Sequence, residues 1–439
     1  MSMPVRDAVI QQKHEYESKR KERYVDRSVV ISGLENNLIK VITGPRRAGK
    51  SFFAIHQVTG TVKTGYVNFD DERLAGSTDY DEILAAVNSV YDNPTHLLFD
   101  EIQNLPRWEL LVNRLARQGY NLILTGSNSH MLSQELSTHL TGRYLQTTIF
   151  PFSFSEYLSL QDQPVTSTGR REHLARYAEQ GGFPELHTKN LNGREYLKTL
   201  FDSIVYKDIV TRFHIRFAKG LDDLAVYLLS NTAQEYSYTT LSQVTRCRSA
   251  HTVQKYLGYL EEAYIFFSVP RFSYKFREQV AANKKIYCID NGFITAKAFN
   301  FSQNRGRLLE NLVAVELKRR SLAESTELYF WKNAEQEEVD FVVKGGTRIT
   351  TLIQVCADAT ASRTRQREVR ALIKAGTELH CKNLIVLTEN EEREESAEWF
   401  GMQGTVRFLP LWKWLLPLPE KTHEELSEGS RKKKERKKK

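Results

Sequence analysis

The chain has 439 residues, 41% of them hydrophobic, and a net charge of +8. This length exceeds one ordinary domain, so we expect two or three domains with well-formed cores. The longest apolar runs are far shorter than a membrane span, and the basic N-terminal segment lacks an apolar block. We therefore expect neither a transmembrane helix nor a secretory signal. Four cysteines lie far apart without zinc-binding spacing, which predicts reduced thiols in a cytoplasmic protein, namely Cys247, Cys288, Cys356 and Cys381.

The positive charge is concentrated at one end of the chain. Residues 431–439 hold eight basic residues and one glutamate, a net +7, so the rest of the chain is nearly neutral. We expect residues 419–439 to form a disordered basic tail. Such a tail either adds a salt-sensitive contact to DNA or to an acidic surface, or is only a solvated end.

Residues 1–30 are expected to form a helical segment on the adenine side of a nucleotide site, followed by an α/β domain over residues 31–180. Near-continuous apolar character indicates parallel strands buried by helices on both faces. In such a sheet the ligand lies at the C-terminal ends of the strands. The expected strands cover residues 38–43, 64–69, 96–99, 121–125 and 144–150.

Residues 44–51 read GPRRAGKS, a complete G-x-x-x-x-G-K-[ST] phosphate loop between the first strand and an expected helix. The glycines let backbone N–H groups and the helix N-terminus point at phosphate oxygens. Lys50 is expected to reach the β- and γ-phosphates, and Ser51 to offer its hydroxyl to Mg²⁺. The predicted nucleotide contacts are Gly44, Pro45, Arg46, Arg47, Ala48, Gly49, Lys50, Ser51 and Phe52, although the two arginines have the alternative of facing solvent.

Polar residues follow the next strands. Asp100 is predicted to hold Mg²⁺, and Glu101 to orient and polarise the attacking water. After the fourth strand, Ser127 or Asn128 either touches the γ-phosphate and this water or caps a helix. Arg143, before the fifth strand, either stabilises transition-state charge, in cis or from a neighbouring subunit, or is an ordinary surface arginine.

Residues 181–295 have a helical pattern that includes a short helix, a turn and a longer helix. Ser237 and Ser249 are expected to cap the two helices. Two extended stretches, residues 265–269 and 284–289, follow around a basic loop. Together these elements predict a winged helix, which either reads DNA or only packs against the ATPase core. The DNA-reading candidates are Arg246, Arg248, His251, Gln254 and Lys255.

A separate α/β or α+β domain is expected over residues 300–418. It begins with an amphipathic helix from about residue 305, whose apolar positions are Leu309, Leu312, Val313 and Leu317. The strands that follow are expected at residues 328–331, 339–343, 352–356, 384–387 and 406–409.

The order of these motifs resembles that of prokaryotic AAA-like ATPases, close to the archaeal ATPase and STAND groups, with a winged helix and a domain similar to the PD-(D/E)XK nuclease fold. The matching segments are GPRRAGKS, LLFDEIQN, LTGSNSHML, LTGRY, PFSFSEYL, KKIYCIDNG, GRLLENLVAVEL, EEVDFVV and LIQVC. The resemblance implies a P-loop NTPase domain that uses ATP and Mg²⁺.

The same resemblance implies a vestigial nuclease site with Glu310 as its first acid, Asp340 as a metal ligand and Gln354 in the (D/E)-x-K pair. Here the chain departs from the pattern, because Cys356 stands in place of the lysine and cannot steady a leaving charge. Unless Lys332 or Lys344 takes that place, we expect a nuclease-derived binding or assembly module.

We therefore expect an enzyme that converts ATP and water to ADP and phosphate and couples its nucleotide state to the two following modules. DNA and further copies of the chain are the candidate partners, and no membrane is expected. The alternatives are a STAND-like nucleotide switch with negligible turnover and an ATP-coupled DNA nuclease.

Overall fold

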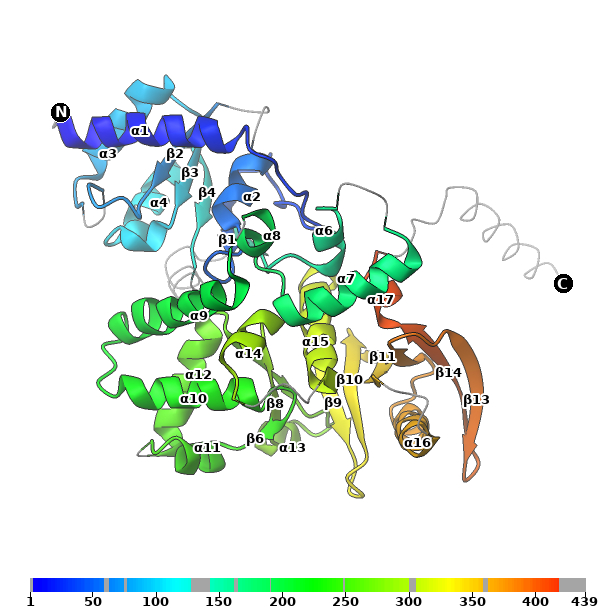
Figure 1. Cartoon of the computed structure of the whole chain (residues 1–439). Coiled ribbons are helices and arrows are strands. Elements are labelled where there is room, and N and C mark those ends of the chain that lie inside the picture. The colour runs from blue at the N-terminus through cyan, green and yellow to red at the C-terminus, as the bar shows by residue number, and fades with distance from the viewer. Residues whose placement is uncertain are drawn as a thin grey trace.

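A computed structural model describes residues 3–58, 63–74, 77–127, 143–161, 165–189, 191–247, 249–299, 305–357 and 362–417. Three parts follow one another along the chain. In Figure 1 an N-terminal α/β domain lies at the upper left, a helical region lies below it, and a mixed β-sheet lies at the lower right.

The N-terminal domain contains a five-stranded parallel sheet in the order β2-β3-β4-β1-β5. All five predicted strands are confirmed, each within two residues of its expected ends. The order places β1 between β4 and β5, with β3 on the far side of β4. The strands are β1 Ile39–Thr43, β2 Thr64–Asn68, β3 His96–Asp100, β4 Asn121–Thr125 and β5 Tyr144–Thr148.

Helices cover this sheet. In α4, Trp108, Leu111, Val112 and Leu115 are buried at the i, i+3, i+4, i+7 spacing of an amphipathic helix. At the start of α3, the Asp79 carboxylate accepts a hydrogen bond from the Glu82 N–H. The helices are α1 Met3–Lys19, α2 Lys50–Gln57, α3 Tyr80–Tyr91, the 3₁₀-helix η1 Ile102–Asn104 and α4 Trp108–Arg117. The predicted P-loop NTPase arrangement of a parallel sheet between helices is therefore present.

The helical region includes an eight-residue π-helix, η3, at Ile204–Thr211. Its α-helices are α6 Phe154–Leu158, α7 Ser167–Gln180, α8 Pro184–Thr188, α9 Gly193–Ser203, α10 Ala218–Ser230, α11 Tyr238–Val244, α12 Ala250–Glu262, α13 Phe276–Ala281 and α14 Asn291–Lys297. A capping box at Ser153 and Glu156 begins the first of them, since each side chain bonds the backbone N–H of the other.

A small antiparallel sheet accompanies α11 and α12, with strands β6 Glu235–Tyr236, β7 Phe266–Pro270 and β8 Lys284–Cys288 in the order β6-β8-β7. The caps predicted at Ser237 and Ser249 are confirmed, because their hydroxyls accept from the N–H groups of Thr240 and Thr252. The segment between β7 and β8 was expected to be a loop and instead contains the short helix α13. The winged-helix interpretation stays a prediction.

The C-terminal part is a six-stranded mixed sheet in the order β13-β14-β12-β11-β10-β9. Its five predicted strands are present. The edge strand β13 was missed because its sequence, REESAEW, is mostly charged and lacks an apolar stretch. The elements are α15 Arg305–Glu324, β9 Thr326–Lys332, β10 Glu338–Gly345, β11 Arg348–Val355, α16 Ser362–Glu378, β12 Leu384–Thr388, β13 Arg393–Trp399, β14 Met402–Pro410 and α17 Leu411–Trp414.

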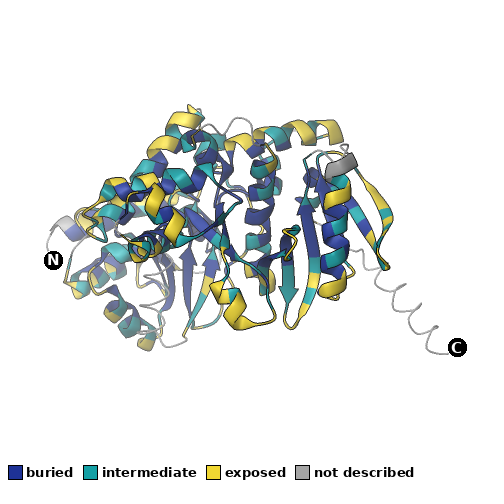
Figure 2. Cartoon of the chain, turned by 90° about the horizontal axis from the view of Figure 1, so that it is seen from below, coloured by how far each residue is buried: buried dark blue, intermediate teal, exposed yellow. Residues whose placement is uncertain are grey.

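Helix α15 joins the helical region to the C-terminal sheet. Its four predicted apolar positions are buried, and so are Asn311 and Glu316, which shows that it is a central helix rather than a surface one. Its buried leucines share a core with the helical region, whereas α16 and one face of the C-terminal sheet form a separate core. Figure 2 shows buried strands in both large sheets and exposed residues on the outer helices. The exact domain boundaries remain a prediction.

Within the described residues, no helix is both long and apolar enough to cross a membrane. The four cysteines are buried and free, as the sequence predicts.

Candidate functional site

The phosphate loop lies between the end of β1 and the start of α2, and two glycines give it its shape. Gly44 has φ 140°, and a Cβ atom built on it would lie 2.0 Å from the Ile149 carbonyl oxygen. Gly49, with φ 90°, precedes the first residue of α2. Only glycine adopts such a backbone at such close approach without strain. The loop is therefore shaped by the residues that the motif requires.

Lys50 is buried at this loop, with 4% of its surface exposed. Its Nζ donates a hydrogen bond to the Pro45 carbonyl, 3.0 Å away. Burial lowers the pKa of Lys50, while the negative charges of Glu101, Asp100 and Asp208 oppose that shift. The ammonium is thus held in the loop among carboxylates that belong to other elements.

Asp100, the last residue of β3, faces the loop. The Ser51 hydroxyl donates to its Oδ1 at 2.8 Å, the Tyr66 hydroxyl donates to its Oδ2 at 3.0 Å, and the Thr125 hydroxyl also donates to Oδ1. Burial and the nearby Glu101 raise the pKa of Asp100, and the three hydroxyl donors counteract that rise. The adjacent hydroxyl and carboxylate of Ser51 and Asp100 are the oxygen ligands that Mg²⁺ prefers, so these residues fit that ion.

Glu101 adopts a left-handed backbone conformation, with φ 50°, where the chain leaves β3. Its N–H donates to the Thr125 Oγ1 at 3.1 Å, and its carboxylate accepts from the Gln103 amide. This conformation turns a half-buried carboxylate away from the strand and leaves it beside Asp100. Thr125 therefore positions both acids.

Of the two candidate residues that follow β4, the structure describes only the first. Ser127 is buried just beyond β4. Asn128 lies outside the described residues. Thr125 was not predicted from the sequence. Its hydroxyl ends the strand between β1 and β3, and that position could have indicated a contact with the acids at the end of β3.

Both loop arginines form ion pairs with the helical region, although the Arg47 side chain is also exposed to solvent, as one of the two alternatives expected. Arg46 forms an ion pair with Asp208 of η3 at 3.0 Å, and Arg47 forms one with Glu185 of α8 at 3.3 Å. Burial raises the pKa of Asp208, Arg46 lowers it, and Glu101 raises it further. No motif in the sequence pointed to Asp208 or Glu185.

Two other predicted nucleotide contacts, Ala48 and Phe52, pack against the segment that precedes β1. Ala48 is buried, and its carbonyl accepts from the Arg27 guanidinium at 3.1 Å. The Phe52 ring lies 5.9 Å from the Tyr24 ring, which stacks on His56 with 4.2 Å between centroids. The segment before β1 thus packs against the loop and α2, and its role on the adenine side stays a prediction.

Arg143 does not lie at the phosphate loop. It is exposed, and its carbonyl accepts from the Ile39 N–H at the N-terminal end of β1. The loop follows the opposite end of the same strand. Because β1 and β5 run parallel with Ile39 opposite Tyr144, the cis role for Arg143 is wrong, and a role across a subunit interface stays a prediction.

The DNA-reading candidates are exposed where the structure describes them: Arg246, His251, Gln254 and Lys255. Arg248 and the basic tail lie outside the described residues. Exposure leaves these side chains available to a partner but does not select DNA.

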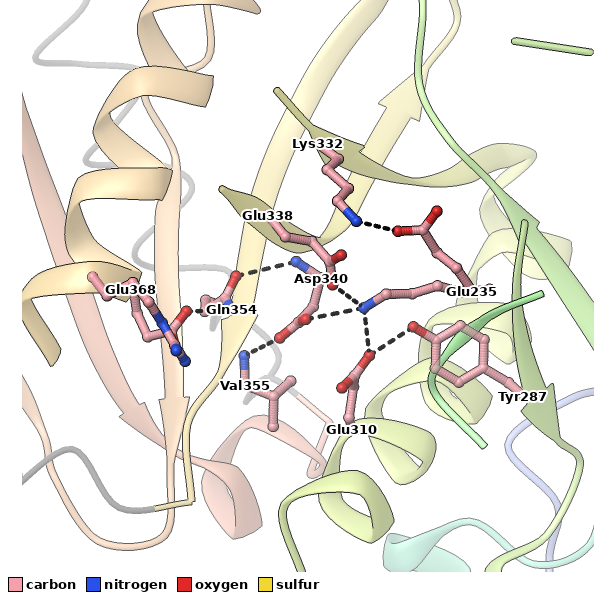
Figure 3. Close-up of polar contacts among 11 residues, drawn as sticks. Glu235, Tyr287, Glu310, Lys332, Glu338, Asp340, Gln354, Val355 and Glu368 are labelled. Atoms are coloured by element: carbon pink, nitrogen blue, oxygen red, sulfur yellow. Dashed lines mark hydrogen bonds and ion pairs between the residues drawn. The ribbon is translucent and has the colours of Figure 1, made fainter. Parts of the chain in front are cut away.

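The vestigial nuclease residues come together at the junction of α15, β10 and β11. The Asp340 N–H donates to Gln354 Oε1 at 3.1 Å, and the Val355 N–H donates to Asp340 Oδ2 at 2.9 Å. Figure 3 shows Glu310 and Glu338 on the other side of Asp340. Among the described residues, no His, Cys, Asp and Glu group is arranged to hold a metal ion.

Neither of the two lysines considered as replacements reaches this junction. Lys332 pairs with Glu235 at 2.5 Å, and Lys344 pairs with Glu327. Cys356 is buried nearby at the end of β11. The lysine that does reach the acids is Lys285 of β8, which sequence reasoning missed because it lies in a different part of the chain.

Comparisons with known proteins agree with this organisation. Residues 36–158 match a family model described as an AAA domain, so the N-terminal part is an AAA-like P-loop domain. Residues 171–304 and 305–414 match two models described as domains of unknown function, DUF8612 and DUF4143.

An uncharacterized protein of Haemophilus influenzae is 28% identical over 337 residues, which cover 73% of this chain and 83% of that protein. The Orc1 protein of Aeropyrum pernix, solved in complex with DNA, is 13% identical, covers 72% of this chain and 94% of that chain, and has a TM-score of 0.28. The uncharacterized protein MJ1544 of Methanocaldococcus jannaschii is 34% identical over 420 residues, which cover 91% of this chain and 93% of that protein. The chain belongs to the family of this Methanocaldococcus protein.

Proposed function

We propose that the chain is a Mg²⁺-dependent ATP hydrolase whose nucleotide state is coupled to the helical region. The observation that carries this proposal is the contact between the Ser51 hydroxyl and the Asp100 carboxylate, 2.8 Å long, beside the buried Lys50. It brings residues of the loop and of β3 together at the edge where ligands of parallel α/β sheets bind.

Each residue has a separate task in this proposal. The Lys50 ammonium and the loop N–H groups bind the β- and γ-phosphates. Ser51 and Asp100 hold Mg²⁺, which when bound neutralises charge on the phosphate oxygens. Glu101 accepts a hydrogen bond from the attacking water and so orients it, since its carboxylate lies beside Asp100 at the same edge.

Steady-state phosphate release by the full chain, with ATP and Mg²⁺, tests the hydrolase. We expect multiple turnovers, and a loss of about 100-fold or more in the rate for Glu101→Gln, because general-base and positioning effects are of this order. The matched control is Glu72→Gln, which removes an exposed carboxylate of the same domain. Equal rates in wild type and Glu101→Gln would remove the assignment of Glu101.

The STAND-like switch is the second candidate, and the ion pairs of Arg46 and Arg47 with the helical region favour it. A phosphate bound in the loop competes with Asp208 for Arg46, so binding alone is able to change the contact between the domains. This candidate predicts a slow, stoichiometric release of phosphate and ATP-dependent assembly of the chain. Multiple turnovers in the same assay would exclude it.

DNA association remains a further part of the proposal, supported by the exposed polar residues at and before α12. If α12 contacts the phosphate backbone, binding to duplex DNA should weaken steeply as salt rises. Lys255→Ala should weaken it equally for different sequences, since phosphate contacts carry no sequence information. Fluorescence anisotropy at two salt concentrations measures this, and unchanged binding by the variant would exclude α12 as the contact.

A further inference from the structure

The acids at the junction of the helical region and the C-terminal sheet surround a single ammonium group. The Lys285 Nζ lies 2.9 Å from Glu310 Oε1, 2.5 Å from Glu338 Oε1 and 3.3 Å from Asp340 Oδ1. Figure 3 shows the three carboxylates converging from α15 and β10, with Tyr287 beside Glu310. The Tyr287 hydroxyl donates to Glu310 Oε1 at 2.8 Å. We call Glu310, Glu338 and Asp340 the acidic cluster.

The outer side of the acidic cluster is occupied as well. Asp340 Oδ2 accepts a hydrogen bond from the Val355 N–H. Gln354 accepts from the Asp340 N–H through its Oε1 and donates from its Nε2 to Glu368 Oε2 at 2.6 Å. Arg367 pairs with the other oxygen of Glu368 at 2.5 Å. On this outer side, Asp340 and Gln354 are therefore engaged with backbone and side-chain groups of the C-terminal domain.

Burial makes the lysine more than a surface ion pair. Only 3% of the Lys285 side chain is exposed, with 14% for Glu310 and 8% for Asp340. Although burial disfavours the ammonium, Glu310, Tyr287, Asp340 and Glu338 raise the pKa of Lys285 well above its ordinary value. Buried carboxylates without a cation are strongly destabilising, so the cluster requires a positive charge at this position.

Lys285 also comes from another part of the fold. It belongs to β8, in the small sheet of the helical region, whereas the three acids belong to α15 and β10. A bound metal ion would neutralise the acids without joining β8 to them. Lys285 neutralises the acids and also joins β8 to them, because its ammonium group is covalently attached to that strand.

We propose that the Lys285 ammonium is the resident cation of the acidic cluster, in the position that a divalent metal would need, and that it clamps the helical region to the C-terminal domain. The cluster excludes divalent metal while the lysine is present. The C-terminal domain consequently serves as an assembly module fixed by this charge, and removal of the lysine creates a site for a divalent cation.

Thermal unfolding of the nucleotide-free full chain, with and without Mn²⁺, tests the proposal. We expect Lys285→Ala to lower the unfolding midpoint by several degrees, and Mn²⁺ to recover part of that loss. Asp340→Asn removes one acid of the cluster, so its response to Mn²⁺ measures binding elsewhere on the chain. The unfolding midpoint of wild type should respond to Mn²⁺ no more than that of Asp340→Asn. The matched control is Lys284→Ala, which removes the preceding lysine from the opposite face of β8. Its charge acts on the buried Glu261 rather than on the acidic cluster, so Lys284→Ala should not be stabilised by Mn²⁺.

A second variant covers the case in which Lys285→Ala does not fold. In Lys285→Met/Asp340→Asn the buried lysine charge and one carboxylate charge are removed together, so this double variant should be more stable than Lys285→Met alone. Three results would overturn the proposal: no loss of stability in Lys285→Ala, no recovery of a folded Lys285→Ala by Mn²⁺, or no gain from the second substitution. Mn²⁺ stabilisation of wild type that Asp340→Asn abolishes would also overturn it, since metal would then bind beside the lysine.

Discussion

At the scale of single residues, the nucleotide site depends on a backbone that side chains would obstruct. Gly44 places its Cα hydrogens against the Ile149 carbonyl, which belongs to the chain just beyond β5. That oxygen is a backbone atom and cannot rotate away. The loop conformation is therefore as specific a requirement as the lysine and serine that follow it.

Gly44→Ala should displace the phosphate loop, because the added Cβ would lie 2.0 Å from that oxygen. We expect a loss of about 1–3 kcal/mol in the free energy of unfolding, as for residues forced into strained backbone conformations, together with a large loss of ATP affinity. Urea unfolding and ATP titration measure the two effects.

Gly119→Ala is the matched control, since Gly119 also has positive φ but nothing lies within 4 Å of its added Cβ. It should lose some stability and keep its ATP affinity. Full ATP affinity in Gly44→Ala would show that the loop tolerates a Cβ and that the described conformation is not the one that binds nucleotide.

The sequence predicted single residues well only where a motif fixes them. Lys50, Ser51, Asp100 and Glu101 lie together as predicted, because their spacing within a loop and after a strand is restricted, and their roles stay predictions. Asp208 and Lys285 were missed, because each acts on residues far away in the chain and its own neighbours carry no signal. Arg143 was assigned a cis role from its sequence alone, and the parallel direction of β1 and β5 excludes that role.

At the scale of elements, η3 links the phosphate loop to the helical region through Asp208. The Asp208 carboxylate pairs with Arg46. Glu101 raises the pKa of Asp208, and Asp208 in turn opposes the lowering of the Lys50 pKa. A π-helix inside a helical segment is uncommon and often marks a functional position. If nucleotide binding is coupled to the helical region as proposed, we expect η3 to carry that coupling.

Asp208→Asn should bind ATP more tightly, by up to about tenfold, because it removes a negative charge near the phosphates and frees Arg46. Titrations at low and high salt should show a larger gain at low salt. Asp223→Asn, in the exposed part of α10, is the control with the same change of charge. Identical affinities for Asp208→Asn and wild type would contradict the coupling through η3.

A second element contact depends on pH. Asp290 caps α14 by accepting from the Gly292 N–H at 2.8 Å, and it also accepts from the Gly182 N–H at 2.7 Å. Burial raises the pKa of Asp290 to about 7, although both N–H groups lower it. Between pH 3.8, the ordinary pKa of this carboxyl, and about pH 7, the folded state therefore keeps a proton on Asp290 that the unfolded state has released.

It follows that the contribution of Asp290 to the free energy of unfolding should fall as pH rises from about 4 to about 7, at a rate set by about 1.4 kcal/mol for each unit of pKa shift. Asp290→Asn should change the slope of wild type by this contribution without removing all pH dependence, because burial and Glu310 also raise the pKa of Asp340. Denaturant unfolding at several pH values gives the slope. A variant slope equal to that of wild type would show that Asp290 does not titrate in this range.

At the scale of the whole molecule, the strands of the N-terminal sheet and their parallel direction could be predicted because buried parallel strands are apolar throughout. The exposed edge strand β13 could not, because its charged residues resemble a loop. The joining of the domains could not be predicted either. It rests on Arg46 with Asp208 and on Lys285 with the acidic cluster, and these contacts form only once separate parts of the chain have folded together.

The proposed function requires that the phosphate loop binds ATP and that Glu101, after β3, orients the water that hydrolyses it. ATP affinity and steady-state phosphate release, measured on the same samples of wild type, Lys50→Ala and Glu101→Gln, test it most directly. We predict that wild type binds and turns over ATP, that Lys50→Ala loses both properties, and that Glu101→Gln retains binding without turnover. Phosphate release by Lys50→Ala at the wild-type rate would contradict the account.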